Sequence, residues 1–288
     1  MNTLILGSGF GLYGYLPAII NYSKKIYLNI EYKKFFSKRK ELTKYTSKII
    51  WYKDQKKIIK YIDYLIIAQR PQDQFRLVKK LAKTQNKIKH FFLEKPIGIN
   101  PNKSKLFINF LNKKKINYSF GFTLSYLNWY KIIKANKKKY QIFNFVWQIK
   151  KKNSNKSWKY QSLKGGGLIR FYGIHFIKAL FDLNFKNIKY NKISKSHWKM
   201  KAYDKRRNSI SIELKYSNKD KFICNLNNLN KVSSINPFGK SINKLKIDPR
   251  CFYIKKYIKD NLNKKIINNK YFDFINFWKK VEIPNYES

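Results

Sequence analysis

The feature that most constrains the fold lies at the amino terminus, in the stretch LILGSGFGLYG. Residues 3–6 are apolar, as in a buried strand, and the run stops at Gly7. A strand followed at once by Gly-x-Gly and a helix, predicted here over residues 11–23, is typical of a dinucleotide-binding turn. The first glycine permits the tight turn, the second, Gly9, lets backbone approach a pyrophosphate, and the helix directs free N–H groups at the phosphates. The third position of the fingerprint is Leu12 rather than glycine.

An acidic residue stands where such a turn needs one. The predicted second strand, residues 26–30, ends at Glu31, some 20 residues after the turn. Its carboxylate is placed to accept hydrogen bonds from the adenosine ribose and to disfavour a 2′-phosphate, which favours NAD. Lys33 and Lys34 follow closely, so NADP stays open as the coenzyme.

Strands and helices alternate through the first third of the chain. The run YLIIA at 64–68 is continuously apolar, as expected for a buried parallel strand. Repeated strand–helix units predict a parallel sheet with right-handed crossovers. The other predicted strands are 49–51, 90–93 and the extended stretch 117–122, and the predicted helices are 73–83 and 101–113.

The pattern changes after about residue 125. Residues 141–150 and 209–216 alternate in strand fashion, and 221–226 are expected to pair with 209–216 through a turn at 217–219. Helices are predicted over 166–182, 251–262 and 271–281. The predicted fold class is therefore α/β: an N-terminal doubly wound parallel sheet of the Rossmann type, residues 1–122, binds NAD(P). An α+β domain with a mostly antiparallel open sheet is predicted to follow over residues 123–288.

The net charge of +49 invites a nucleic-acid interpretation. However, 57 of the 64 basic residues are lysine, they are spread along the whole chain, and residues with A/T-rich codons dominate the composition. Arginine, which favours base readout and bidentate phosphate binding, is scarce. Compositional drift explains the charge, so we expect no nucleic-acid partner and keep a basic nucleic-acid-binding protein as an alternative.

Other classes are excluded by what the sequence lacks. There is no run of ~18 uncharged apolar residues and no basic stretch before an apolar one at the start, so we expect neither a membrane partner nor a secretory signal, and a cytoplasmic protein. Two cysteines and three scattered histidines predict neither a disulfide framework nor a metal site.

A second candidate motif is FFLEKPIG, residues 91–98. A strand that ends in Glu94-Lys95-Pro96 places a lysine at the carboxyl edge of the sheet, where ligands bind in open α/β folds. Such a lysine, beside a carboxylate and a cationic nicotinamide, is suited to hold a proton for a substrate hydroxyl. In a chain this rich in lysine, a surface lysine is an equally good interpretation of the motif alone.

A third motif is the Gly165-Gly166-Gly167 run before a predicted helix that carries His175. The neighbours of His175 on this helix are apolar, which alone favours a core histidine. The glycine run permits unusual dihedral angles and the close approach of a ligand, which favours a site. Trp158, Arg170 and Tyr172 add a stacking surface and hydrogen-bond donors.

Four stretches together resemble the Gfo/Idh/MocA oxidoreductases, the family of glucose–fructose oxidoreductase and inositol dehydrogenase. They are LGSGFGLYGYLPAI (6–19), DYLIIAQRPQDQ (63–74), FFLEKPIG (91–98) and SWKYQSLKGGGLIRFYGIHFIKAL (157–180). The resemblance implies NAD(P)-dependent hydride transfer at a hydroxyl-bearing carbon of a sugar, sugar nucleotide or cyclitol. It also implies that the domain over residues 123–288 binds the substrate and that the protein homo-oligomerises through the C-terminal sheet.

The resemblance extends to individual residues. It implies that Lys95 and His175 lie at the reacting carbon, with Trp158, Arg170 and Tyr172 near the substrate. The coenzyme-binding residues that it and the glycine turn predict are Gly7, Ser8, Gly9, Phe10, Gly11, Glu31, Ala68, Gln69, Pro71, Gln74, Glu94 and Lys95.

The sequence departs from the family's pattern at three places. Phe171 stands where the family has an acid four residues before the histidine, and Gln74 replaces a frequent histidine. The usual Arg or Asn is absent from 123–126. Two interpretations follow: Lys95 and His175 suffice for catalysis, or the protein is a catalytically inactive sensor that binds a dinucleotide or a sugar.

Overall fold

The computed structural model describes residues 1–84, 86–136, 139–151, 157–228, 231–234, 250–262 and 269–283. These residues form two compact units. The first comprises Met1–Gly98, Leu106–Thr123 and Asn243–Asn268, and the second Ile99–Lys105, Leu124–Ile242 and Asn269–Ser288. The domain division at 122/123 stays a prediction.

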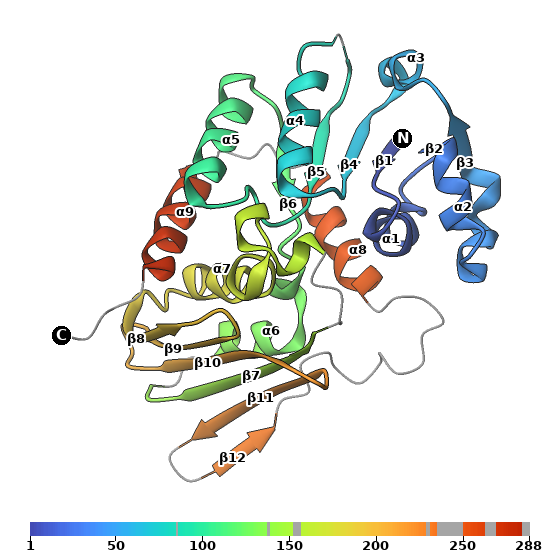
Figure 1. The fold of residues 1–288 in the computed structure, drawn as a ribbon. Coiled ribbons are helices and arrows are strands. Elements are labelled where there is room, and N and C mark those ends of the chain that lie inside the picture. The colour runs from blue at the N-terminus through green and yellow to red at the C-terminus, as the bar shows by residue number, and fades with distance from the viewer. Residues whose placement is uncertain are drawn as a thin grey trace. The chain divides into compact units, whose positions relative to one another are not determined.

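The first unit is built on a six-stranded, fully parallel sheet of order β3-β2-β1-β4-β5-β6 (Figure 1). Its strands are β1 Asn2–Leu6, β2 Lys25–Asn29, β3 Ile49–Tyr52, β4 Tyr64–Ile67, β5 His90–Leu93 and β6 Tyr118–Phe120. The central strands β1 and β4 are buried along their paired length because both faces of a parallel sheet are covered by helices. The order reverses between β1 and β4, which is the switch point where ligands bind in such sheets.

The helices of this unit connect its strands, except the last helix, which follows the second sheet in the sequence. They are α1 Leu16–Ile19, α2 Lys33–Phe36, α3 Gln55–Ile58, α4 Pro71–Leu81, α5 Pro101–Lys113, whose first turn falls in the second unit, and α8 Arg250–Asn261. A π-helical turn, Gly11–Tyr15, precedes α1, and 3-10 turns cover Ile30–Tyr32, Lys40–Lys48 and Ile59–Tyr61. Although α8 follows the second sheet in the sequence, it packs against α1 and the turn before it.

The second unit is built on a six-stranded mixed sheet of order β12-β11-β7-β10-β9-β8, in which only β7 and β10 are parallel neighbours within the described residues. The strands are β7 Ile142–Lys150, β8 Asn187–Ile193, β9 His197–Tyr203, β10 Ser209–Ser217, β11 Lys221–Asn228 and β12 Lys231–Ser234. The helices are α6 Asn128–Ala135, α7 Ile174–Asp182 and α9 Asn269–Glu282, and shorter helical turns cover Thr123–Tyr126, Trp158–Tyr160, Ser162–Lys164 and Leu168–Gly173.

The core of the second unit lies between its sheet and α6 and α7. Trp129 of α6 packs edge-to-face on Phe145 of β7, with ring centroids 4.8 Å apart, and stacks on Phe176 of α7 at 5.8 Å. All three side chains are fully buried. The predicted fold class, a Rossmann sheet followed by a mostly antiparallel sheet, is confirmed.

One predicted strand pairing is wrong. Residues 221–226 do not pair with 209–216 as a hairpin, because β7 lies between β10 and β11. It pairs along nine residues with β10 in parallel and along seven with β11 antiparallel. Residues 141–150 thus belong to a central strand. The turn at 217–219 connects β10 to β11 past the end of β7.

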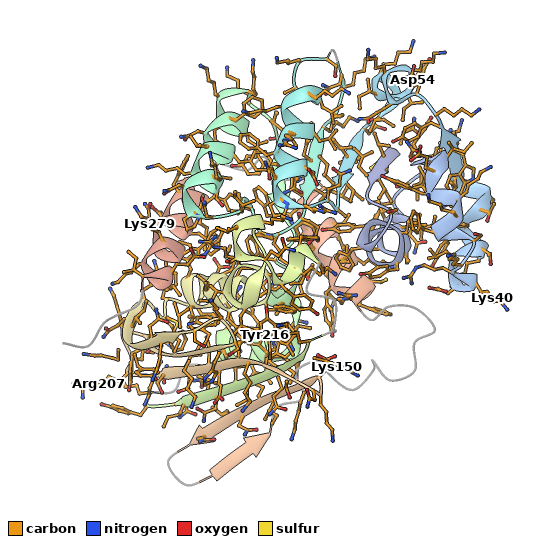
Figure 2. The ribbon with its side chains drawn as sticks, in the orientation of Figure 1. Lys40, Asp54, Lys150, Arg207, Tyr216 and Lys279 are labelled. Atoms are coloured by element: carbon orange, nitrogen blue, oxygen red, sulfur yellow. The ribbon has the colours of Figure 1, made fainter. Side chains whose placement is uncertain are left out.

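The basic residues are distributed over both units. Figure 2 shows Lys40 in the first unit and Lys150, Arg207 and Lys279 in the second, each on the surface and each in a different part of the chain. No helix in the described part of the chain combines the length and apolar character needed to cross a bilayer.

Candidate functional site

The glycine turn after β1 meets the end of β4 at the switch point of the first sheet. Gly7 has φ +142°, a backbone conformation that side chains rarely adopt, and a Cβ there would lie 2.5 Å from the carbonyl oxygen of Ala68. β1 ends at Leu6, directly before Gly7. Gly7 therefore takes the first glycine position of the dinucleotide-binding fingerprint.

The helix after the turn starts with its backbone close to the sheet. A Cβ on Gly11 would lie 3.0 Å from Cγ2 of Ile5, whereas a Cβ on Gly9 would have no atom within 4 Å. Leu12, at the third fingerprint position, is fully buried. The close approach of helix to strand, which the fingerprint's last glycine normally permits, is made at Gly11 here. The open space at Gly9, and the tight fit on either side of it, suit the approach of a coenzyme pyrophosphate.

Tyr32 contacts this turn, whereas the neighbouring Glu31 is exposed. The hydroxyl of Tyr32 accepts a hydrogen bond from the N–H of Gly7 at 3.1 Å, and burial raises the pKa of this tyrosine. Glu31, predicted to bind the ribose, is exposed after β2, and its backbone N–H is held by the side chain of Asn29 at 2.9 Å. Sequence reasoning missed Tyr32 because a tyrosine beside an acid carries no pattern of its own.

The Glu94 carboxyl is buried at the carboxyl end of β5. Its Oε1 accepts a hydrogen bond from the Tyr15 hydroxyl at 2.6 Å, and both side chains are almost inaccessible. A Cβ on Gly121 would lie 2.6 Å from that hydroxyl and 2.8 Å from Oε1, so glycine is required beside the pair. Gln74, on α4, clamps the Glu94 backbone: its Oε1 accepts from the Glu94 N–H at 2.8 Å and its Nε2 donates to the Glu94 carbonyl at 3.0 Å.

The predicted catalytic lysine follows directly. Lys95 is half-buried, and the Lys95–Pro96 peptide bond is cis. Burial raises the pKa of Glu94 to about 7, although the charge of Lys95, the Tyr15 hydrogen bond and the charge of Arg250 act in the opposite direction. The site therefore holds a carboxyl that titrates near neutrality next to cationic groups, as acid–base sites often do.

Helix α8 brings a cation to the same place. The Arg250 guanidinium lies 4.7 Å from the ring centroid of Phe10 and 5.4 Å from that of Tyr13, both in the segment after the glycine turn. The thiol of Cys251, the next residue, donates to the Tyr13 carbonyl at 3.2 Å. Arg250 is a functional candidate that sequence reasoning missed, because nearly 240 residues separate it from the turn.

A buried polar chain contacts α8 further along the helix, at Tyr257. The hydroxyl of Ser119 contacts the Tyr257 hydroxyl at 2.7 Å and Nε2 of His90 at 2.9 Å. Burial lowers the pKa of His90 to about 4, so this imidazole is neutral at physiological pH. Because Tyr257 also contributes to the raised pKa of Tyr15, the chain reaches the surroundings of the Tyr15–Glu94 pair.

The other predicted coenzyme residues lie around the same edge. Ser8 and Phe10 stand in the turn itself, Ala68 and Gln69 are half-buried after β4, and Pro71 is the buried first residue of α4. The structure thus brings the coenzyme-binding residues predicted in the first unit to the carboxyl end of one sheet. Their role in binding stays a prediction.

The predicted substrate residues belong to the second unit. His175 is buried on α7, and Phe171 packs edge-to-face on Trp158 at 5.3 Å and on Tyr172 at 4.8 Å. Gly165 and Gly167 have φ near +80°, as the glycine run predicts. The close approach, however, is made to the chain itself: a Cβ on Gly166 would lie 2.0 Å from the Trp158 carbonyl oxygen.

Arg170 is engaged within the second unit. Its Nε and Nη2 donate to the two carboxylate oxygens of Glu282, each at 2.8 Å, and its Nη1 donates to the Ser162 carbonyl at 3.0 Å. Trp278 donates to the same Glu282 at 2.8 Å. This bidentate pair ties α9 to the segment before α7 and favours a structural role; substrate binding by Arg170 stays a prediction.

Among the described residues, no group of three or more His, Cys, Asp or Glu side chains converges in a way that could hold a metal ion. The first unit instead offers what a dinucleotide needs: an unobstructed glycine, backbone N–H groups and nearby cations.

No protein-family model and no curated protein matches this sequence. Solved structures do match. The WlbA (WbpB) dehydrogenase from Thermus thermophilus, in complex with NAD and UDP-GlcNAcA, is 12% identical, with a TM-score of 0.71 over 99% of this chain and 95% of that chain. KijD10, a 3-ketoreductase from Actinomadura kijaniata in complex with NADP, is 9% identical, with a TM-score of 0.68 over 99% and 96%.

A regulatory protein shares the fold as well. The super-repressor mutant of Gal80p from Saccharomyces cerevisiae is 11% identical, with a TM-score of 0.65 over 98% of this chain and 93% of that chain. At such identities the likeness is one of fold. The resemblance to Gfo/Idh/MocA oxidoreductases, predicted from four sequence stretches, is confirmed at that level: this chain has the fold of NAD(P)-dependent sugar and cyclitol dehydrogenases.

Proposed function

We propose that the protein is an NAD(P)-dependent oxidoreductase that transfers a hydride between nicotinamide and a hydroxyl-bearing carbon of a sugar, sugar nucleotide or cyclitol. The observation that carries the proposal is the carboxyl edge of the first sheet. There the glycine turn after β1, open at Gly9, shares one end of the sheet with Lys95 and the buried Glu94–Tyr15 pair.

The roles of the residues follow from their positions. The turn from Gly7 to Gly11 binds the pyrophosphate, and Glu31 binds the adenosine ribose. The bound coenzyme supplies the hydride acceptor or donor. Lys95 holds and moves the proton of the reacting hydroxyl, while Gln74 fixes the backbone of Glu94 and thereby the start of the Lys95–Pro96 segment.

The second unit supplies the substrate-binding part of the proposal. His175 is the second catalytic residue of the proposal, and Trp158 and Tyr172 offer aromatic surface to a sugar-like ring. A cytoplasmic location and homo-oligomerisation through the second sheet complete the proposal.

The test is a coenzyme titration followed by a substrate panel. We expect calorimetry on the full chain to detect NAD or NADP, and absorbance at the nicotinamide band to change with at least one sugar, sugar nucleotide or cyclitol. A chain that binds neither coenzyme would contradict the proposal as a whole.

A specific observation favours a second candidate, a coenzyme- or sugar-binding sensor without turnover. Phe171 stands where the resemblance implies an acid, and its ring is packed between Trp158 and Tyr172, so it provides no carboxylate to orient His175. A sensor would bind the coenzyme with the affinity of an enzyme and leave nicotinamide absorbance unchanged across the whole panel.

The exposed carboxylate of Glu31 gives the first prediction. Glu31→Ala should weaken NAD binding by about 10-fold and change NADP binding much less, because a carboxylate that accepts from a ribose hydroxyl repels a 2′-phosphate. Calorimetric titration with both coenzymes measures the ratio, and Glu41→Ala, at another site in the same unit, is the control. Equal losses for NAD and NADP would reject the ribose assignment.

Arg250 gives the second prediction. Its guanidinium over the Phe10 ring adds positive charge beside the proposed pyrophosphate site, so Arg250→Gln should weaken both coenzymes by about 10-fold. The matched control is Arg76→Gln on α4, which removes an exposed arginine of the same unit. Unchanged affinity in the Arg250 variant would place its guanidinium outside the coenzyme site.

A further inference from the structure

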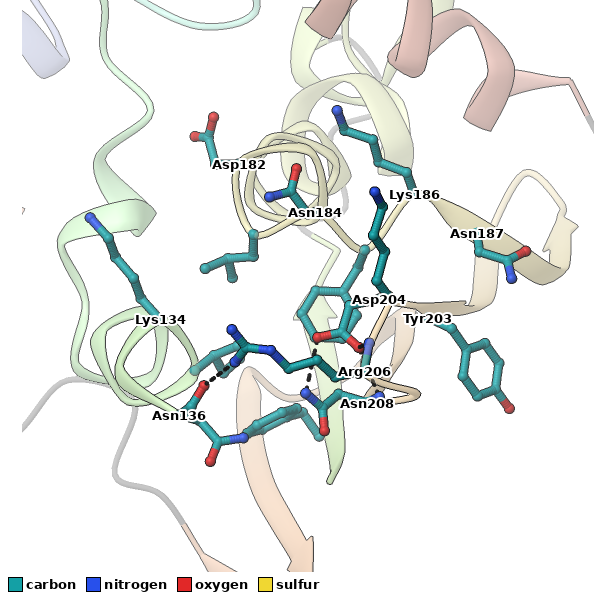
Figure 3. Close-up of a pocket in the computed structure, with 15 residues that line it drawn as sticks. Lys134, Asn136, Asp182, Asn184, Lys186, Asn187, Tyr203, Asp204, Arg206 and Asn208 are labelled. Carbon is teal, nitrogen blue, oxygen red and sulfur yellow. Dashed lines mark hydrogen bonds between the residues drawn. The ribbon is translucent and has the colours of Figure 1, made fainter. Parts of the chain in front are cut away.

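A cavity lies wholly within the second unit. It has a volume of about 820 Å³ and is bordered by the end of α6, the connection from α7 to β8, and the turn between β9 and β10 (Figure 3). Its volume falls in the range of small-molecule pockets, roughly 300–1,000 Å³. The buried rings of Phe143 and Phe185 form part of its lining.

Four cationic side chains surround this cavity. Lys134 comes from α6, Lys186 from the α7–β8 connection, and Lys205 and Arg206 from the β9–β10 turn. Figure 3 shows that Lys134, Lys186 and Arg206 come from these three segments, and all four cationic side chains are exposed. Within the described part of the chain none of the four forms an ion pair; Arg206 donates to the Asn136 carbonyl at 3.4 Å, and Lys186 lies 4.6 Å from the Phe181 ring centroid.

The two carboxylates of the lining are engaged by the protein. Asp182 pairs with Lys178 and, at 3.4 Å, with Lys270. Asp204 accepts hydrogen bonds from the backbone N–H of Arg206 at 2.8 Å, and from the backbone N–H and the side-chain amide of Asn208, each at 2.9 Å. The four cations outnumber these two carboxylates, so the lining carries a net positive charge.

From this arrangement we infer that the cavity is a second ligand site, which binds a small phosphorylated molecule with adjacent phosphoryl groups. Cations that three segments place around one cavity suit a multivalent anion better than a single charge, because each phosphoryl group offers several acceptor oxygens. The ring of Tyr203 and the amides of Asn184 and Asn187, also in the lining, can contact the organic part of such a molecule. The site shares no residue with the glycine turn and does not rest on the proposed activity.

Two simpler explanations make different predictions. The lysines belong to a chain with a net charge of +49, so they could be background. The helices α6 and α7 also end at the cavity, at Ala135 and Asp182, and cations at helix C-termini offset exposed carbonyl groups. Neither explanation predicts saturable binding of a multivalent anion that depends on these particular residues.

The first experiment is calorimetric titration of the full chain with inorganic pyrophosphate at fixed ionic strength. The double variant K186Q/R206Q should bind at least ~10-fold more weakly than the wild type, whereas K189Q/K192Q, which removes two exposed lysines of β8 outside the cavity, should bind within about twofold of it. Equal losses in the two double variants, or no saturable binding, would overturn the inference. So would a loss in Arg250→Gln that K186Q/R206Q does not show, because it would assign the pyrophosphate to the coenzyme turn.

A residue-level measurement on the wild type needs no folded variant. Lysines are acetylated with and without pyrophosphate and quantified by mass spectrometry, with Lys189 and Lys192 as internal references. Protection of Lys134, Lys186 and Lys205 relative to the references supports the site. Protection spread evenly over all five lysines, or protection by a short DNA duplex and not by pyrophosphate, would overturn it.

Discussion

Lys95→Met should lower kcat by at least ~100-fold while leaving coenzyme affinity nearly unchanged. The substitution keeps an unbranched side chain of similar length and removes only the group that exchanges a proton with the reacting hydroxyl. Lys95 is half-buried beside Glu94, so methionine fits without exposing a large apolar surface. Steady-state kinetics on a substrate found in the panel, together with a coenzyme titration, separates the two effects.

The control for this prediction is Lys87→Met, which removes an exposed lysine shortly before β5. It should turn over at the wild-type rate. If Lys95→Met retains wild-type turnover as well, Lys95 has no part in proton transfer. If it loses coenzyme binding by the same factor as kcat, the residue acts in binding rather than in chemistry.

Glu94→Gln should make stability less dependent on pH. The raised pKa, from 4.5 to about 7, means that folded Glu94 keeps its proton where the unfolded chain has released it. Folding is therefore favoured below about pH 4.5, and this advantage is lost as pH rises to about 7. Between pH 5 and pH 8 the wild type should lose about 2–3 kcal/mol of unfolding free energy relative to Glu94→Gln.

Denaturant unfolding of both proteins at several pH values measures this difference. The comparison isolates Glu94, because the groups around it, Tyr15, Lys95, Arg250 and Tyr257, are the same in both proteins. Glu213→Gln is the control: burial alone would raise the pKa of Glu213, but His197 and Lys215 hold this pKa below the usual glutamate value. A constant offset between wild type and Glu94→Gln over this range would show that Glu94 is ionised throughout.

Much of the fold follows from local sequence patterns. The apolar run at 64–68 predicts a central strand, and β4 is buried along its whole length because both its faces are covered. The end of β1 at Leu6 is equally readable, since the glycine after it must turn. The pairing of β11 was missed because alternation shows which face of a strand is buried but not which strand lies beside it.

The candidate site was predictable only where its residues form a contiguous motif. The glycine turn and Glu94-Lys95 each lie within one short stretch. Tyr15 and Arg250 do not: the partner of Glu94 is 79 residues away, and Arg250 reaches Phe10 from the distant helix α8. Such contacts arise from tertiary packing, and the spacing of these residues along the sequence does not predict them.

The central claim is that the first unit binds a nicotinamide coenzyme with Lys95 at the reacting end. A crystal structure of the full chain with NADH tests it most directly. We expect the pyrophosphate against the backbone of Gly9 and Phe10, the adenosine ribose at Glu31, and the nicotinamide ring beside the Lys95 ammonium. A coenzyme bound elsewhere, or one at the turn whose nicotinamide lies away from Lys95, would contradict the claim.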